Sequence, residues 1–144
     1  MEILDQVIDK VQVRNIERIK LEIKQSELPV IKGYEAKIRS IIENLIVNSI
    51  EAMPVKGNLS VETLITEDKT DEISYINIIV SDTGVGMSHE FIENKLFKPF
   101  TSTKKKGLGI GMYQTYEAVK QMNGKLLVES EEGIGTTFTL MLPV

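Results

Sequence analysis

The spacing of apolar positions in the first part of the chain predicts a helix, a strand and a second helix. Residues 2–12 place their apolar side chains at helical spacing. Residues 18–24 alternate apolar and polar side chains, which is typical of a half-buried strand. Residues 28–33 predict a short extended piece. The strongest helical signal spans 35–53, where isoleucine and leucine form one wide face, and Pro54 ends it.

The middle of the chain predicts two strands followed by a short helix and a loop. Residues 58–66 and 73–81 are typical of strands, and the second is apolar enough to be central in a sheet. The polar residues 67–72 between them predict a mobile turn. Residues 88–96 predict a short helix, and the basic, glycine-rich residues 101–109 predict a loop.

The last part of the chain predicts one more helix and two strands. Residues 111–124 have helical spacing, and Asn123 and Gly124 end the helix. Residues 125–142 predict a strand, a glycine turn and a final strand. The order of elements indicates an α+β domain, with one sheet covered on one face by helices. Since no linker divides the chain, we expect one domain over residues 1–144.

Composition and charge exclude several classes of function. The formal net charge of −4 does not favour a general nucleic-acid-binding surface. The chain has no cysteine and one histidine, which excludes disulfides, thiolate metal sites and a histidine-rich zinc site. No apolar run approaches the ~20 residues of a membrane span, and the charged N-terminus is not a signal peptide. We expect a soluble, cytoplasmic domain without direct membrane contact, although its parent protein could be membrane-anchored.

Two asparagines stand out in the predicted helix over 35–53. Asn44 and Asn48 are one turn apart and share a face, which Ser40 and Glu51 extend. Asparagine is a mediocre helix former, so its repetition there needs a reason. One interpretation is that the stripe faces water. The other is that the amide oxygens face a cleft that holds Mg²⁺, which takes one or two protein oxygens together with substrate phosphates.

Asp82 follows the most apolar strand and precedes two glycines, Gly84 and Gly86. Such an aspartate is often a turn former. It can also accept a hydrogen bond from an exocyclic amine, which adenine carries, while the glycines allow a planar ligand to approach the backbone. The segment is not a dinucleotide fingerprint, because it lacks the third glycine and the acidic residue precedes the glycines.

A third glycine-rich segment precedes the last predicted helix. The backbone amides of Gly107, Gly109 and Gly111 can hold phosphate at the start of that helix. The lysines over 104–106 are either solvated or neutralise phosphate charge there. No P-loop motif occurs in the chain.

Taken in order, these segments resemble the catalytic ATP-binding domain of sensor histidine kinases, a superfamily shared with DNA gyrase B and the mismatch-repair ATPases. "NLIVNSIEA" is similar to the N box of that family, "DTGVGM" to its G1 box, "LFKPFTSTK" to its F box and "GLGIG" to its G2 box. "GIGTTFTLMLP" is similar to its closing strand. The resemblance runs from about residue 2 to 143. It implies a two-layer α/β sandwich, the Bergerat fold, with a mixed sheet of about five strands and about three helices.

The resemblance also implies roles for individual residues, with ATP and Mg²⁺ as the cofactors. Asp82 would accept from the adenine amine, Asn48 would supply the Mg²⁺ oxygen, and Asn44 would lie beside the phosphates. Lys104 would reach a phosphate, so Asn44, Asn48 and Lys104 are the expected catalytic residues. The other expected nucleotide-binding residues are Gly84, Gly86, Met87, Phe97, Gly107, Leu108, Gly109, Ile110, Gly111, Thr136 and Thr137.

Several of these assignments stay open or depart from the family pattern. Either Thr136 or Thr137 would lie near adenine. Phe97 and Phe100 would anchor a flexible lid or are plain core aromatics. Tyr34 stands where the family has aspartate, which leaves the helix start without its usual cap.

Three classes of protein compete: a histidine kinase domain, a self-contained ATPase of this fold and an anti-sigma-type serine kinase. In the last two classes a glutamate lies one turn before the Mg²⁺-binding asparagine, where it takes a proton from water or serine. Here that position is Asn44. Glu43 points about 100° away around the helix. A neutral imidazole is already a nucleophile and needs less help, so we favour the histidine kinase.

His89 superficially resembles a phosphoacceptor histidine, because Glu90 follows it. However, it lies in a short segment without the proline of the acceptor box, so we interpret it as a surface residue. We therefore expect that the phosphoacceptor and dimerisation domain is absent from this chain. The chain would be monomeric and nearly inactive alone, and a response regulator would act downstream.

Overall fold

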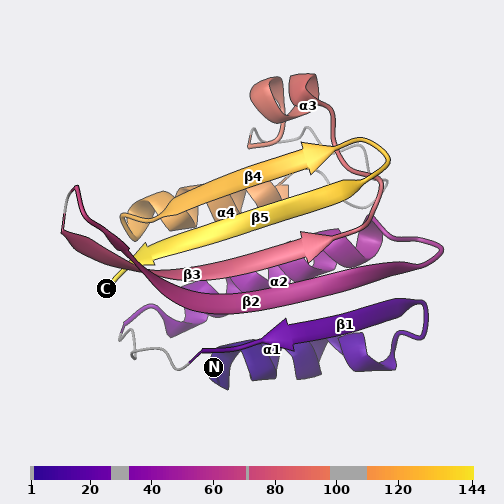
Figure 1. Ribbon diagram of the computed structural model, residues 1–144, viewed down its shortest axis with the longest axis horizontal. Helices are drawn as coiled ribbons and strands as arrows, with labels where there is room; N and C mark the ends of the chain where they lie inside the picture. The colour runs from indigo at the N-terminus through magenta and orange to yellow at the C-terminus, as the bar shows by residue number, and fades with distance from the viewer. Residues whose placement is uncertain (1, 27–32, 71, 98–109) are drawn as a thin grey trace.

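The computed structural model describes the chain except for residues 1, 27–32, 71 and 98–109 (Figure 1). The described elements are α1 (Glu2–Val11), the 3₁₀ helix η1 (Val13–Asn15), β1 (Ile19–Lys24), α2 (Glu35–Glu51), β2 (Gly57–Asp68), β3 (Ile73–Asp82), α3 (His89–Asn94), α4 (Ile110–Gln121), β4 (Lys125–Glu131) and β5 (Gly135–Pro143).

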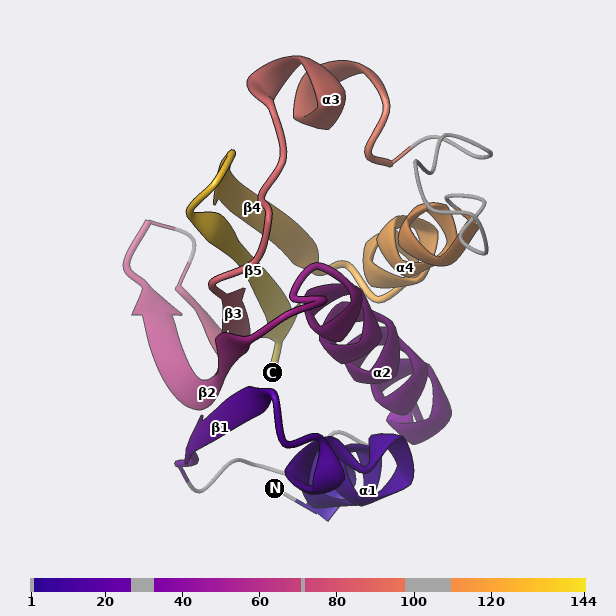
Figure 2. The same ribbon diagram turned by 90° about the vertical axis from the view of Figure 1, so that its right-hand side faces the viewer.

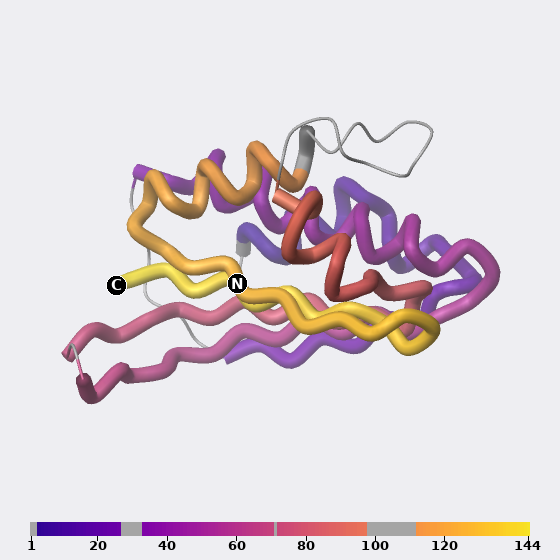
Figure 3. Tube along the Cα trace, turned by 90° about the horizontal axis from the view of Figure 1, so that it is seen from above, coloured from indigo at the N-terminus to yellow at the C-terminus, as the bar shows by residue number. Residues whose placement is uncertain are grey.

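The strands form one mixed sheet of five strands in the order β1-β2-β3-β5-β4. β1 and β2 are parallel, and the other neighbours are antiparallel. β3 is the central strand, as its apolar sequence predicts. Figures 2 and 3 show α1, α2 and α4 on one face of this sheet, with α2 between the other two helices. The α+β, two-layer prediction is therefore confirmed.

The core lies between the sheet and α2. Alternate residues of β3 point toward the helices, and Ile76, Ile78 and Val80 are all at most 3% exposed. The apolar face of α2 meets them, and its residues Ile42 and Leu45 are fully buried. Each such side chain contributes about 1.5–3 kcal/mol of hydrophobic free energy. This packing fixes α2, and with it the asparagines, relative to the C-terminal end of β3.

The ends of several elements differ from the sequence prediction. β2 is longer than expected, because Glu67 and Asp68 pair with Ser74 and Ile73 of β3 rather than forming a turn. The 3₁₀ helix η1 was not predicted. Residues 28–32 of the predicted extended piece lie outside the described residues.

Two predicted helix ends are confirmed. Asn123, two residues after the end of α4, adopts the left-handed conformation with φ 56°. Tyr34 is the N-cap of α2 and makes no side-chain capping hydrogen bond, as its side chain predicts.

Candidate functional site

Asp82 ends β3 with its carboxylate held by two backbone amides. Its Oδ1 accepts from Gly84 N at 2.9 Å and from Thr136 N at 3.3 Å. Thr136 lies directly opposite Asp82 in the β3–β5 register, and the aspartate is only 7% exposed. Within the described residues Oδ2 takes part in no hydrogen bond. The carboxylate is therefore fixed in place with one acceptor oxygen left for a ligand.

A serine that the sequence did not single out ties three segments together beside Asp82. Ser130 of β4 accepts from Met87 N at 2.8 Å, and its Oγ lies 2.7 Å from Thr136 Oγ1. Ser130 pairs with Thr136 across β4 and β5, so both hydroxyls lie on the face that carries Asp82. The alternation of side chains along β4 could have shown on which face of the sheet Ser130 lies, but only once the register of the β4–β5 hairpin was known.

The strand register decides between the two threonines that the sequence left open. Thr137 is one residue beyond Thr136, so its side chain lies on the opposite face of the sheet. There its Oγ1 is 2.7 Å from Ser81 Oγ. The expectation that Thr137 contacts the same ligand as Asp82 is therefore corrected, and Thr136 is the residue beside the carboxylate.

The glycines after Asp82 serve the packing of the loop against its neighbours. A Cβ at Gly84 would lie 2.5 Å from Ala52 O at the end of α2. Gly86 has φ +72°, and a Cβ there would meet the carbonyl oxygen of Glu131. The residue between them, Val85, donates to Ala52 O at 3.0 Å and accepts from Gly133 N at 2.8 Å. These glycines therefore allow the backbone of α2 and of the β4–β5 turn to approach closely. Their expected role beside a ligand stays a prediction.

Asn44 and Asn48 lie in the contact between α2 and α4. Asn44 Nδ2 donates to Thr115 Oγ1 at 3.1 Å, and Asn48 Nδ2 donates to Met112 Sδ at 3.0 Å. A thioether can only accept, so this contact turns Asn48 Oδ1 away from Met112. Both asparagines are half-buried. The interpretation in which this part of the stripe simply faces water is therefore wrong.

Glu43 lies on a different side of α2 from the asparagines. Its Oε2 is 3.1 Å from Lys10 Nζ of α1. The ion pair holds the carboxylate on the α1 side, while Asn44 faces Thr115 of α4. The structure therefore brings no carboxylate of α2 to the position of Asn44.

His89 is exposed at the start of α3, which has six residues. Ser88 caps this helix by accepting from Phe91 N at 3.1 Å. The helix is short, as predicted, and it bears no resemblance in length to a helical hairpin. We therefore keep the interpretation of His89 as a surface residue.

Phe97 packs on α4 at the edge of the described chain. Its ring stacks on Tyr116 with centroids 4.6 Å apart, and Lys120 Nζ lies 4.9 Å from the Tyr116 centroid. Of the other expected site residues, Ile110 and Gly111 open α4. The expected residues that lie outside the described part of the chain are Phe100, Lys104, Gly107, Leu108 and Gly109.

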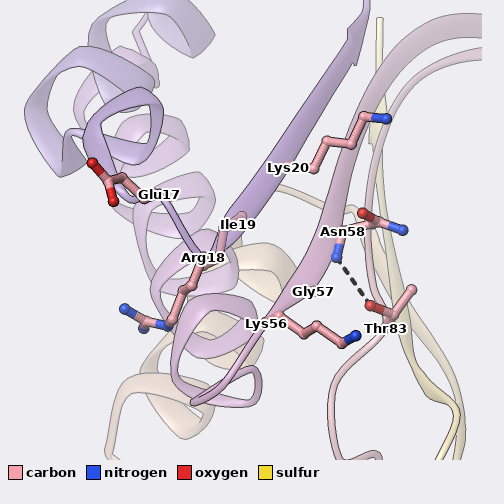
Figure 4. Close-up of a pocket in the computed structure, with 8 residues that line it drawn as sticks. All are labelled: Glu17, Arg18, Ile19, Lys20, Lys56, Gly57, Asn58 and Thr83. Carbon is pink, nitrogen blue, oxygen red and sulfur yellow. Dashed lines mark hydrogen bonds between the residues drawn. The ribbon is translucent and has the colours of Figure 1, made fainter.

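A separate pocket of about 640 Å³ lies beside the start of β1 and β2 (Figure 4). It is lined by Arg18, Lys20 and Lys56, among others, and by Thr83, whose Oγ1 accepts from Asn58 N at 3.0 Å. Figure 4 shows the three cationic side chains pointing in different directions. The pocket therefore does not concentrate positive charge at one point, and the Asp82 region remains the candidate site.

Comparison with known proteins identifies the family to which the chain belongs. A profile of the histidine kinase-, DNA gyrase B-, and HSP90-like ATPase family matches residues 33–144. The chain belongs to this family. The family resemblance seen in the sequence motifs is thus confirmed.

Curated members of the family are similar over most of this chain. Sporulation kinase C of Bacillus subtilis (strain 168) is 36% identical over 126 residues, which are 88% of this chain and 28% of that protein. Sporulation kinase E of the same organism is 33% identical over 118 residues, which are 82% of this chain and 15% of that protein. The chain thus spans less than a third of the length of these relatives.

Solved structures of family members share the fold. The mycobacterial sensor histidine kinase MprB superposes with a TM-score of 0.82 at 20% identity, over 99% of this chain and 92% of that one. The catalytic domain of histidine kinase ThkA gives 0.79 at 20% identity, over 99% and 90%. Full-length ShkA in complex with AMPPNP gives 0.79 at 24% identity, over 99% and 29%. Among the described residues, no helix of this family member is both long and apolar enough to cross a membrane.

Proposed function

We propose that this domain binds Mg²⁺ and ATP and donates the γ-phosphate to a histidine on a separate dimerisation domain of a sensor histidine kinase. A response regulator would then receive the phosphate. Three findings support the proposal: the family membership, the sporulation kinases among the relatives, and the AMPPNP complex of a protein with the same fold.

The surroundings of Asp82 fit an adenine base. A carboxylate oxygen and a neighbouring hydroxyl can accept hydrogen bonds from the exocyclic amine of adenine. Guanine and hypoxanthine present a carbonyl oxygen at that position, which would face the carboxylate acceptor to acceptor. The site therefore favours ATP over GTP.

The surroundings of Asn48 fit a magnesium ion that is held together with phosphates. Asn48 Oδ1 is turned away from Met112 and can supply one oxygen ligand. The described residues contain no group of three or more acidic, histidine or cysteine side chains that could hold a metal ion, so a metal held by protein ligands alone is not favoured there. Mg²⁺ bound with one protein oxygen, waters and phosphates matches this composition, and it would neutralise phosphate charge. We propose that Lys104 and the glycines over 107–111 help to bind the phosphates. This part of the proposal rests on the sequence motifs alone.

The position of Glu43 is the observation that carries the choice of acceptor. Water and serine need a base, whereas a neutral imidazole is already nucleophilic. The one-turn position before Asn48 is an amide, Asn44, and the adjacent carboxylate is paired with Lys10 on the far side of α2. This arrangement favours a histidine acceptor over the ATPase and serine kinase alternatives.

Replacing the proposed metal ligand in the intact parent kinase tests this function. Asn48→Ala should abolish phosphotransfer to the acceptor histidine and remove most of the dependence of ATP binding on Mg²⁺. Ser40→Ala, an exposed position on the same stripe, is the matched control and should leave both unchanged. An Asn48→Ala kinase that folds normally and transfers phosphate at the wild-type rate would contradict the proposal.

A further inference from the structure

The hydrogen bonds of Ser130 leave only one direction for the hydroxyl of Thr136. A serine hydroxyl has one hydrogen and two lone pairs. Ser130 Oγ lies 3.0 Å from Gly135 O, and a carbonyl oxygen can only accept, so the serine hydrogen goes there. One lone pair accepts from Met87 N at 2.8 Å. The remaining lone pair faces Thr136 Oγ1 at 2.7 Å, so Thr136 must be the donor in that contact.

Because the Thr136 hydroxyl donates to Ser130, it can only accept from a ligand beside Asp82. Its hydrogen is committed to Ser130, and only its lone pairs remain. Thr136 is 6% exposed and lies opposite Asp82, whose Oδ2 is also an acceptor. The two groups together therefore present acceptors only, although a hydroxyl by itself could have served either an amino or an oxo group.

We propose that Ser130 is a positioning residue that determines base specificity. By accepting the Thr136 hydrogen, Ser130 makes the site select a purine with an amino group at C6 and reject one with an oxo group. Ser130 acts through Thr136, and the proposal requires no contact between Ser130 and the nucleotide. The proposal rests on the proposed function, since it takes ATP as the ligand.

The opposite face of the sheet supplies a matched control. Ser81 and Thr137 form a second serine–threonine pair across β3 and β5, with the same Oγ–Oγ1 distance of 2.7 Å. Their side chains point away from Asp82. Removing Ser81 therefore deletes the same kind of hydrogen bond from the same sheet without reaching the site.

The test compares binding of ATP and inosine triphosphate (ITP), which carries an oxo group at C6, by calorimetry on the purified chain. In Ser130→Ala the Thr136 hydroxyl can rotate and donate to that oxo group. The ratio of ATP affinity to ITP affinity should then fall by about three- to tenfold, as expected for one hydrogen bond. Ser130→Cys, which keeps the shape of the side chain with a slightly larger atom that accepts weakly, should give a smaller fall. Ser81→Ala should keep the wild-type ratio.

If Ser130 had only a structural role, its loss would not change this ratio, because a loosened loop would lower the affinity for both nucleotides alike. A folded Ser130→Ala chain that keeps the wild-type ratio, or an equal fall in Ser81→Ala, would overturn the proposal. If Ser130→Ala does not fold, an unchanged ratio in Ser130→Cys overturns it instead. A wild-type chain that binds neither nucleotide, or binds both equally, would count against the proposed function itself.

Discussion

Among the described residues, two backbone amides and no cation hold the carboxylate of Asp82 in the candidate site. Both described bonds go to Oδ1, from Gly84 N and Thr136 N. The sequence identified Asp82, Asn44 and Asn48 by their types and spacing. It did not identify Ser130, Thr115 or Met112, the partners that orient them, because those contacts depend on strand register and on how α4 docks against α2.

Asp82→Asn should weaken ATP binding strongly while leaving the fold intact. The amide oxygen can replace Oδ1 as the acceptor for both backbone N–H groups, which places the amide nitrogen where Oδ2 was. A donor then faces the adenine amine in place of a charged acceptor. The loss should be about 1.5–3 kcal/mol, roughly ten- to more than a hundredfold in affinity, by titration calorimetry. Unchanged ATP affinity would remove the adenine assignment.

Ser49 should be replaceable by alanine at no cost in stability. Its Oγ is buried on α2, where it has no hydrogen-bond partner among the described residues. An unsatisfied buried hydroxyl destabilises a fold by about 1–3 kcal/mol, and alanine is the better helix former. Ser49→Ala should therefore leave the free energy of unfolding unchanged or raise it by about 1 kcal/mol in urea titrations.

Thr115→Val serves as the comparison for Ser49→Ala. Thr115 is also 1% exposed, but its Oγ1 accepts from Asn44 Nδ2. Its loss should lower the free energy of unfolding by about 1 kcal/mol. If Ser49→Ala destabilises the protein as much as Thr115→Val does, the hydroxyl of Ser49 has a partner that the structure does not show.

At the scale of elements, the loop after β3 is locked between the end of α2 and the β4–β5 turn. Gly86→Ala should destabilise the protein by several kcal/mol, because it adds a clash with Glu131 O to the strain of a positive φ. Gly133→Ala is the matched control: its φ is +79°, but a Cβ there meets nothing within 4 Å. It should cost only about 1–2 kcal/mol. If the two variants unfolded at the same melting temperature, the packing described for this loop would be contradicted.

Glu43 and the asparagines lie on different sides of α2, and the effect of replacing Glu43 shows whether it takes part in phosphotransfer. Its ion pair with Lys10 joins side chains that are 31% and 64% exposed, so it contributes at most about 1 kcal/mol. Glu43→Gln should therefore leave phosphotransfer by the parent kinase unchanged and alter stability only slightly. A large loss of phosphotransfer would identify Glu43 as a base and favour the serine kinase or ATPase alternatives.

Most elements could be predicted from the sequence, because apolar periodicity reports which face of an element is buried. The exceptions have physical reasons. Glu67 and Asp68 have the composition of a turn, yet they extend β2 because β3 offers them backbone partners. Thr136 and Thr137 could not be told apart, because only the register shows which of them shares a face with Asp82.

At the scale of the whole molecule, the chain has the fold of a catalytic domain and spans 15–28% of the length of the two sporulation kinases. At the position of α2 one turn before Asn48, Asn44 offers an amide and not a carboxylate that could activate water. We therefore predict that the chain binds ATP with Mg²⁺ but hydrolyses it very slowly. His89→Ala, which alters an exposed residue of α3, should change neither property.

Incubation with γ-labelled ATP tests the central claim most directly. The chain alone should release little phosphate and carry no label. Adding the dimerisation domain of its parent kinase should produce an acid-labile, base-stable label on that second chain, as expected for phosphohistidine. Transfer between separate chains should be slow, because it lacks the roughly millimolar effective concentration that a covalent tether provides. Steady ATP turnover by the chain alone, or label on its own His89, would contradict the account.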